Sequence, residues 1–546
     1  MRNAISTASV LVVVAALVGC LGGPPPPPEL KVTSPQRGLI QSEAGTVTVT
    51  GTAVPGSDGA VVASVSVNGT KAKLAADGSF SVDVDVSSGA MLIETTATSI
   101  EGAKATDARA VQVGQKRAVG SMIDRALAVS VSAEAFAKLA ATAGPLVKGT
   151  DFNTLLAPMQ PMASFGDSIA NVKLSITKLT LGDVKLTMTP VDGGLELTVE
   201  LTNLSVAAKA AYAGTLVPDG TTTVNVSADK VTIAGTLTVT PAGVTGFTTK
   251  LASPAVQTTN LKLQASGLIG DILDLLQDNL SSTVQKITTS SIEKALQPAV
   301  NAAFGALAGP KQLNVLGKQI EFQVSPSVVT FSRAGALASL NLAVKIGGSE
   351  ASPGFIYTPN GTPSMTVGDG IQLGLADDLM NEMLAEVHAL GLLDIHLAQD
   401  FGLFDVADIK LAMPPMINAN TGDGKMRLVL GDMVASFTDH GKPLITAALN
   451  AQVDLAVDRG DSADQIALQF GKIHAFVNVT GGDDGNDVEV GGSDLTDAAN
   501  TAIAVQLDSL SKFMVTVPIP TLAGVQLDSL SLHGDSGYVV VAGDIH

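Results

Sequence analysis

Residues 267–307 carry an amphipathic helix pattern that is much longer than most globular domains contain. Apolar residues recur every three or four positions in two runs, which end at Ile287 and Leu307, and charged or polar residues take the opposite face. At 1.5 Å per residue this helix would be roughly 60 Å long, so its apolar stripe needs cover along a whole domain. Because the flanking sequence alternates as β-strands do, we expect a curved sheet wrapped around the helix.

The N-terminus carries a second informative pattern. Arg2 precedes an apolar run from Ala8 to Val18, which is too short to span a bilayer and is followed by Gly19-Cys20. This pattern resembles a bacterial lipoprotein signal, residues 1–19, and implies cleavage before Cys20 and acylation of its thiol. An ordinary secretory signal followed by a chance cysteine is the alternative. Cys20 is the only cysteine in 546 residues, which favours lipidation and excludes intramolecular disulfides.

Two short segments follow the lipidation signal. Residues 20–29 contain five consecutive prolines, which predict a stiff polyproline tether. Residues 30–114 alternate polar and apolar side chains between turn signals such as Asn68-Gly69 and Asp77-Gly78, and this pattern predicts a small β-sandwich. The segment resembles bacterial immunoglobulin-like modules, which implies a spacer first and a partner-binding domain second.

Composition narrows the function classes. Hydrophobic residues make up 46% of the chain and the mean hydropathy is +0.35, which is unusually apolar for a chain without a predicted membrane-spanning helix. The formal net charge of −19 argues against binding to nucleic acid and against electrostatic docking on anionic headgroups. The absence of Trp and the presence of only three Tyr disfavour sugar binding and base stacking. The interior is therefore either a large core or a lining for an apolar ligand.

From residue 116 onward one organisation occurs twice: a short helix, a series of long alternating strands and a closing helix. The first copy has its short helix at 133–143 and closes with the helix at 267–307. The second copy has a helix at 377–390, stopped by Gly391, and closes with a helix at 495–510. We expect strands at 126–131, 172–181, 183–188, 194–204, 222–232, 235–239, 328–346, 371–375, 426–434, 444–457 and 473–479.

This order resembles the tubular lipid-binding superfamily, which contains the bactericidal/permeability-increasing and lipopolysaccharide-binding proteins. The residues that carry the resemblance are Gly193–Leu197, Leu268–Leu307, Gly370–Leu397, Pro518–Leu527 and Gly537–Val541. The resemblance implies an α+β fold with two tandem modules, residues 115–327 and 328–546, in an elongated boomerang. Each module would hold acyl chains in an apolar slot between its helices and its sheet. This chain is acidic and lacks the basic tip with which family members contact lipopolysaccharide, so we do not expect it to neutralise lipopolysaccharide.

Candidate lining residues follow from the helix stripes. For any one of them, ordinary core packing is the competing interpretation. Each buried methylene contributes about 0.8 kcal/mol, so an acyl chain can bind without any polar motif. The candidates are Phe136, Leu139, Leu276, Leu280, Val284 and Ile287 in the first module, and Leu379, Met383, Leu384 and Val387 in the second.

Signals for catalysis are weak. Gly534-Asp535-Ser536-Gly537 copies the tetrapeptide around a trypsin-like serine, but no His stands in a matching context and a hairpin turn explains it better. The six histidines show no pair at metal-ligand spacing, and the acidic stretch Asp483–Asp487 lacks the ligand order of an EF-hand. The sequence therefore predicts no catalytic residue, no metal ligand and no cofactor.

The leading hypothesis is a non-enzymatic lipid-binding or lipid-transfer lipoprotein of the bacterial cell envelope. Its partners would be a phospholipid or another acyl lipid and, through acylated Cys20, a membrane; nucleic acid is excluded and a protein partner is left open. Leu21 after the lipidated cysteine favours the outer membrane, by analogy with enteric lipoproteins. The competing hypothesis is a structural or adhesive surface lipoprotein with filled cores, and a hydrolase that uses Ser536 is a remote third.

Overall fold

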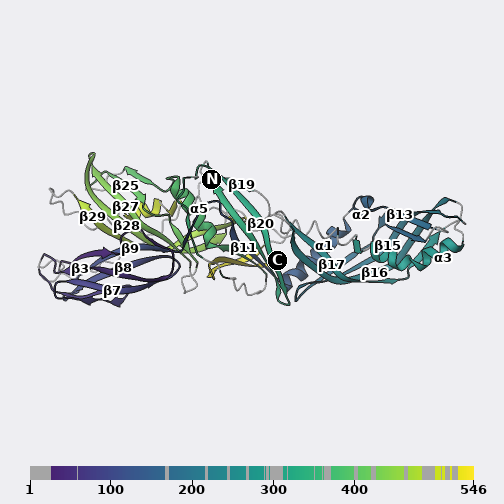
Figure 1. Ribbon diagram of the computed structural model, residues 1–546, viewed down its shortest axis with the longest axis horizontal. Helices are drawn as coiled ribbons and strands as arrows, with labels where there is room; N and C mark the ends of the chain where they lie inside the picture. Colours follow the sequence, from purple (N-terminus) through teal and green to yellow (C-terminus); the bar gives the residue numbers. More distant parts are fainter. Residues whose placement is uncertain are drawn as a thin grey trace, which may run out of the picture. The chain divides into compact units, whose positions relative to one another are not determined.

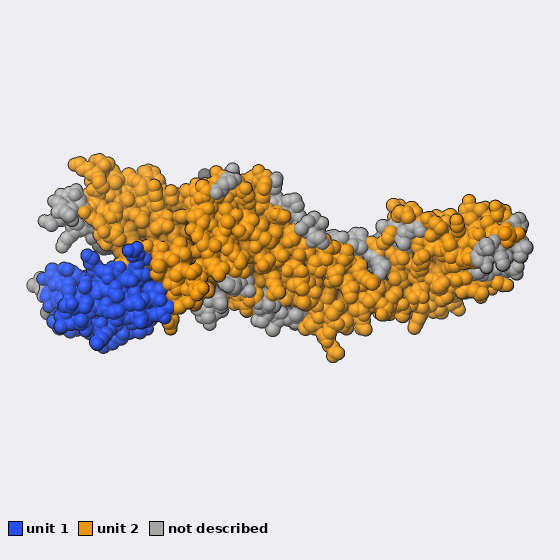
Figure 2. Space-filling model, viewed as in Figure 1, with its two compact units in different colours: residues 1–36, 46–84, 93–107 blue, residues 37–45, 85–92, 108–546 orange. Residues whose placement is uncertain are grey.

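The structure is a computed structural model (Figure 1), and its residues divide into two compact units (Figure 2). The first unit contains residues 1–36, 46–84 and 93–107, and the second contains residues 37–45, 85–92 and 108–546. The structure describes residues 26–545 except 58, 150, 167–170, 216–218, 243–245, 266–269, 288, 291–293, 295–310, 316–317, 350, 359–360, 362–369, 399–403, 420–425, 460–464, 483–498, 506, 509, 511–516 and 519–526.

The N-terminal part of the chain forms a β-sandwich, as its alternating sequence predicts. Val49, Val65, Val67 and Phe80 are at most 4% exposed and form part of its core. Gly51 lies against the Phe80 ring, where a Cβ atom would come within 2.7 Å of the ring. One sheet has the order β1-β3-β7-β6 and the other β2-β9-β8-β4-β5; the strands are β1 Glu29–Ser34, β2 Leu39–Gln41, β3 Gly45–Val54, β4 Val62–Val67, β5 Thr70–Lys71, β6 Lys73–Leu74, β7 Ser79–Val86, β8 Gly89–Ser99 and β9 Lys104–Val113.

A long antiparallel sheet, here called the large sheet, follows in the second unit. Its order is β12-β13-β15-β16-β17, with β14 paired to β15 and β18 paired to β16 (Figure 1). At about 3.3 Å per residue, the 23 residues of β16 extend over roughly 75 Å. Its strands are β12 Ala163–Gly166, β13 Asn171–Thr180, β14 Val184–Val191, β15 Gly194–Ala213, β16 Gly220–Ala242, β17 Gly246–Thr259 and β18 Lys262–Ala265.

Strand β16 corrects one sequence prediction. The sequence predicts two strands, 222–232 and 235–239, because Gly235 reads as a break, but the structure has one continuous strand. The β16–β17 register shifts between Ala234 and Thr236, and a Cβ on Gly235 would lie 3.0 Å from the backbone oxygen of Ala252. Gly235 therefore marks an irregularity where two backbones approach closely, and not the end of a strand.

The predicted long helix is interrupted where the structure describes it. Helix α3 covers Gly270–Asp278, Asn279 forms a turn, and residues 280–287 are helical again. The Asn279 carbonyl accepts hydrogen bonds from the Ser282 and Thr283 hydroxyls, at 2.9 and 2.8 Å, as well as from the Thr283 amide. Hydroxyl groups that bond back to a helical carbonyl bend a helix, which explains the break. Most of the predicted stretch after residue 290 lies outside the described residues.

A second sheet, here called the shared sheet, combines strands from both predicted copies. Its order is β19-β20-β21-β11-β23-β32-β31, and every pairing is antiparallel. The predicted boundary between residues 327 and 328 falls inside β20, so this strand belongs to neither copy alone. The strands are β11 Ile123–Ser132, β19 Lys311–Val315, β20 Lys318–Ser332, β21 Gly335–Ile346, β23 Ile371–Ala376, β31 Leu527–Asp535 and β32 Tyr538–Ile545; β10 Gln115–Arg117 pairs separately with β22 Phe355–Tyr357.

A third sheet, here called the C-terminal sheet, completes the second unit. Helix α5, Asp377–Ala389, contributes Leu379, Leu384 and Val387 to a core cluster that contains residues of both the shared and the C-terminal sheets. Gly391 follows this helix with φ 65°, as predicted, and the Leu392 amide bonds back to the Val387 carbonyl. The order is β24-β25-β27-β28-β29-β30, with β26 on β27; the strands are β24 Ile395–Ala398, β25 Val406–Leu411, β26 Met416–Asn418, β27 Met426–Asp439, β28 Lys442–Arg459, β29 Gln465–Gly482 and β30 Val517–Pro518.

The fold as a whole is mostly β, with a curled half-barrel sheet and an N-terminal sandwich. Its remaining helices are α1 Ala133–Lys148, α2 Phe152–Leu156 and the 3₁₀ turn Ala157–Met159. Residues 499–505, 507–508 and 510, in the predicted closing helix 495–510, are helical. In the described part of the chain, each helix is either too short or too polar to cross a bilayer.

Candidate apolar binding cleft

An open apolar cleft of about 310 Å³ lies between helix α1 and strand β14. This volume is at the small end of the roughly 300–1,000 Å³ that small-molecule sites enclose. The lining consists of Ala137, Ala140 and Ala141 from α1 and Val184, Lys185, Leu186, Thr187 and Met188 from β14.

The cleft follows from the side chains that face each other. Ala137, Ala140 and Ala141 are spaced three and four residues apart, so they share one face of α1. Alanine has a single side-chain carbon, so three alanines on one helix face leave space that leucine or methionine side chains would fill. On β14 the pleat turns Leu186 inward, where it is 6% exposed, whereas Lys185 and Thr187 point to the opposite face and are exposed.

An ion pair connects the end of α1 to the residue that precedes β14. The Lys148 ammonium, at the end of α1, lies 2.8 Å from the Asp183 carboxylate just before β14. The hydrogen bond from Lys148, together with its positive charge, lowers the pKa of Asp183. Lys185 is the one charged side chain of the lining. The arrangement suits an apolar chain with an anionic end group.

The lining residues predicted for the first module lie elsewhere. Leu276, Val284 and Ile287 are 3 to 4% exposed and pack in the core cluster beneath the large sheet, with Leu280 partly buried against it. Phe136 and Leu139 are partly buried on α1, and the Phe136 ring centre lies 6.3 Å from that of Phe331. None of these six residues lines the α1–β14 cleft.

Those predicted for the second module are also outside this cleft. Leu379, Leu384 and Val387 are at most 6% exposed, and Met383 packs partly buried against the same cluster. Their assignment to a lipid slot stays a prediction. The apolar patterns in the sequence do not predict this cleft, although the spacing of the three alanines on α1 indicates a helix face with small side chains.

Burial of Val284 leads to a testable prediction. A tryptophan at this position has no room in the core cluster, so we expect Val284→Trp to lower the free energy of unfolding by about 1–3 kcal/mol. Urea denaturation followed by circular dichroism measures the loss. The exposed neighbour Lys286→Trp is the control and should unfold like the parent chain. Unchanged stability in Val284→Trp, with less bound lipid, would instead identify a cavity along this helix.

Helix α5 carries a feature that no apolar pattern reveals: four carboxylates that are at most 3% exposed. Three of them, Asp378, Glu382 and Glu386, are spaced four residues apart and form a stripe. Each of the four carboxylates accepts a hydrogen bond from the backbone amide of a different segment. The amide of Thr358 donates to Asp378 at 2.8 Å, that of Gly120 to Glu382 at 2.6 Å, that of Ile346 to Glu386 at 2.5 Å and that of Ala419 to Asp377 at 3.0 Å. The helix is thus bonded to four loops and strands around it.

Burial changes the protonation of two of these groups. Loss of solvent raises the pKa of Asp377 to about 8, and the charge of Asp378 adds to the effect. Loss of solvent likewise raises the pKa of Glu382 to about 8, although the Gly120 amide opposes the shift. Glu382 Oε2 has no solvent contact and no hydrogen-bond partner among the described residues. A proton on Glu382 relieves the cost of burying that charge.

The tetrapeptide around Ser536 forms a turn between two strands of the shared sheet. Ser536 and Gly537 both have positive φ and join β31 to β32, which confirms the predicted hairpin turn. The Ser536 hydroxyl donates to Asp535 at 2.8 Å. Cys20 and the acidic stretch Asp483–Asp487 lie outside the described residues.

Comparison with known proteins identifies the sandwich segment first. Residues 28–115 match the family described as "Glucodextranase, domain B". No curated protein sequence matches this chain.

Solved structures extend the comparison to most of the chain. The fold is similar to that of lipopolysaccharide binding protein. That crystal structure matches with 14% sequence identity and a TM-score of 0.36, over 78% of this chain and 99% of that protein. P47 of Clostridium botulinum E1 matches with 8% identity and a TM-score of 0.27, over 78% and 100%. Latherin matches with 11% identity and a TM-score of 0.17, over 32% and 94%. The structural similarity predicted from the sequence is thus found.

Proposed function

We propose that this chain is a non-enzymatic lipid-binding or lipid-transfer lipoprotein of the bacterial cell envelope. Acylated Cys20 anchors it at the outer membrane, and the polyproline tether separates the anchor from the β-sandwich. Two tandem modules follow. The first holds the acyl chain of a phospholipid or another acyl lipid between α1 and β14.

The α1–β14 cleft carries this proposal. Its walls are formed mostly by alanine, valine, leucine and methionine side chains, and its volume of about 310 Å³ accommodates part of an acyl chain. Each methylene removed from water contributes about 0.8 kcal/mol, so burial of several methylenes of one acyl chain gives useful affinity. The exposed Lys185 of the same strand can meet a phosphate or carboxylate group. The chemistry needed is burial and charge pairing, with no bond made or broken.

We expect Ala141→Trp to fill the cleft and to lower the amount of bound lipid several-fold. Ala141 is exposed, so the larger side chain should cost little stability. Native mass spectrometry of the purified chain measures the bound lipid. Because the natural chain has no Trp, emission from the new indole also reports whether its surroundings are dry.

Lys138→Trp is the matched control for this substitution. Lys138 is exposed on the same helix but does not line the cleft. It should retain the lipid content of the parent chain, with indole emission typical of water. Equal lipid content in both variants would remove the cleft from the binding site.

A structural or adhesive surface lipoprotein is the second candidate. The observation that favours it is the dense packing of Leu276, Val284 and Ile287, which are all at most 4% exposed. In this case the parent chain would carry no lipid apart from its covalent anchor, and the β-sandwich would bind the partner. Lipid extraction of the purified parent chain, followed by mass spectrometry, separates the two candidates. The detergent is chosen so that its mass cannot be confused with that of a lipid.

A further inference from the structure

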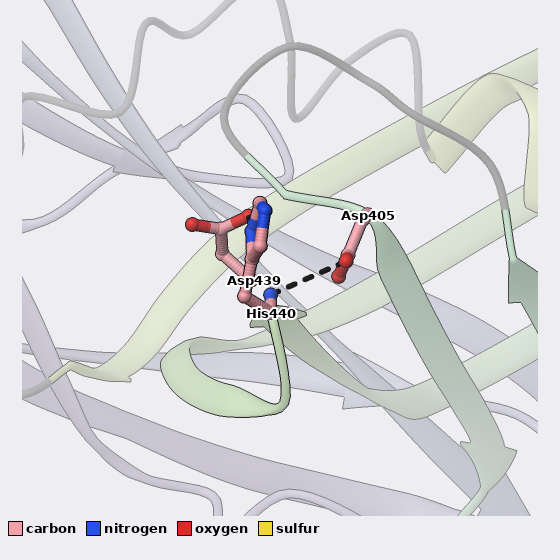
Figure 3. A group of neighbouring side chains, drawn as sticks. All are labelled: Asp405, Asp439 and His440. Carbon is pink, nitrogen blue, oxygen red and sulfur yellow. Dashed lines mark hydrogen bonds and ion pairs between the residues drawn. The ribbon is translucent and has the colours of Figure 1, made fainter.

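The hairpin turn between β27 and β28 brings two carboxylates and an imidazole together (Figure 3). His440 and Gly441 have φ values of 49° and 78°, as a two-residue type I′ turn requires, and Asp439 ends β27. Asp405 stands directly before β25, where Val406 pairs with Thr438 of β27. One ligand atom from each of Asp405, Asp439 and His440 lies within 4.8 Å of the other two.

Backbone contacts position the residues that carry the three side chains. The Asp405 amide donates to the Thr438 carbonyl at 3.0 Å, and Asp405 Oδ2 accepts the His440 amide at 3.2 Å. His440 Nδ1 lies 2.6 Å from Asp439 Oδ1. The group is therefore preorganised by a tight turn and a neighbouring strand, rather than by flexible loops.

One oxygen of this group has no hydrogen-bond partner in the described part of the chain. Asp405 Oδ1 has no contact with solvent and no hydrogen-bond partner among the described residues. A shielded carboxylate oxygen without a donor costs free energy, because its hydration is lost and not replaced. The same carboxylate belongs to the group in which one ligand atom of each residue lies within 4.8 Å of the other two. A cation shared by the three groups would remove this cost.

The donor set indicates which cation fits. Calcium prefers six to eight oxygen ligands and does not select imidazole, whereas Zn²⁺ binds imidazole nitrogen together with carboxylate oxygen. Bonds of roughly 2.0–2.2 Å need ligand atoms within about 4.4 Å of each other, which is slightly closer than the present limit of 4.8 Å. The His440 side chain is 86% exposed and can rotate to close this gap.

We propose that Asp405, Asp439 and His440 bind a divalent transition-metal ion of the Zn²⁺ type, with water in the remaining positions. The ion clips the β27–β28 turn to the start of β25 and stiffens this end of the C-terminal sheet. In binding, the ion takes the place of any proton shared by His440 Nδ1 and Asp439 Oδ1. The proposal does not depend on lipid binding, because the site and the α1–β14 cleft share no residue.

Calorimetric titration of the full chain tests the proposal. The chain is stripped of metal with EDTA, transferred to chelator-free detergent buffer and titrated with Zn²⁺ alone. We expect saturation near one equivalent and at least a tenfold increase in Kd for His440→Asn and for Asp405→Asn. Asparagine tolerates the positive φ at position 440, so the turn should survive, and circular dichroism checks this.

His396→Asn is the matched control. His396 Nδ1 lies 2.7 Å from Asp408 Oδ1 in the same sheet, an exposed pair that resembles His440 and Asp439 but is not part of the three-residue group. This variant should bind Zn²⁺ as the parent chain does. Absence of Zn²⁺ binding, an unchanged Kd in His440→Asn, or an equal loss in His396→Asn would each overturn the proposal. Co²⁺ absorption provides a second readout: its visible band should be lost in His440→Asn and retained in His396→Asn.

Discussion

A Cys20→Ser variant should leave the membrane fraction almost completely. The side chain of Cys20 is the only thiol in the sequence, and the five prolines that follow predict an extended, solvated helix and not a membrane-inserting one. Acyl chains bind membranes at about 0.8 kcal/mol per buried methylene, so their loss removes the main membrane contact. Cell fractionation, combined with labelling by a clickable fatty acid, measures both localisation and acylation.

Gly23→Ser is the control for the lipid anchor. It places the same residue type three positions further along, after the predicted acylation site. This variant should remain labelled and membrane-bound. If Cys20→Ser still carried the label, or stayed with membranes to the same extent as Gly23→Ser, the predicted anchor would be wrong.

The second large effect concerns the pH dependence of stability. The pKa values of Asp377 and Glu382 are about 8 in the folded chain, but 3.8 and 4.5 are their ordinary values. Between about pH 4 and pH 8 the folded state therefore holds protons that the unfolded state releases. These groups favour folding below about pH 4, and their contribution is lost as the pH rises toward 8. We expect Glu382 alone to account for a few kcal/mol of this loss, since each unit of pKa shift corresponds to about 1.4 kcal/mol.

Glu382→Gln removes the titration while keeping an oxygen that can accept the Gly120 amide. We expect its free energy of unfolding to fall by a few kcal/mol less between pH 5 and pH 8 than that of the parent chain, because only Asp377 of the two groups still titrates. Urea denaturation at the two pH values gives this difference directly, and any pH-independent cost of the new amide cancels. Glu134→Gln, on the exposed surface of α1, is the control and should keep the parent slope. An identical slope in Glu382→Gln would show that Glu382 is ionised when folded.

The sequence predicted those parts of the fold that repeat a local pattern. The β-sandwich strands, β11, β13, β23 and the stop of α5 at Gly391 follow from alternation and turn chemistry, and the structure confirms them. The large sheet was predicted as shorter strands, because Gly235 looks the same in sequence whether it ends a strand or permits a close backbone approach. The break at Asn279 was missed because it depends on two hydroxyls that choose a backbone carbonyl over solvent.

The candidate sites were harder to predict than the fold. An apolar stripe marks residues that avoid water, but it does not separate a packed core from a lined cavity. Leu276 and Val284 are buried, and their assignment to a lipid slot stays a prediction. The cleft arises instead where side chains are small, at Ala137, Ala140 and Ala141. The carboxylate stripe on α5 reads as a solvated face in sequence. Only the surrounding segments, which are distant along the chain, determine that it is buried.

The pairing order of the shared sheet has a consequence for how the chain is made. Val131 pairs with Ala336 on one side and with Ile371 on the other, and Ile371 pairs in turn with Gly543. A strand formed early in synthesis must wait for partners more than 200 residues later, and the last neighbour of β23 arrives with the final residues. Such long-range pairing is slow and leaves strand edges open to aggregation. The shared sheet therefore cannot close until β32 has been synthesised, and we expect a chaperone that shields β11 and β23 until then to raise the yield.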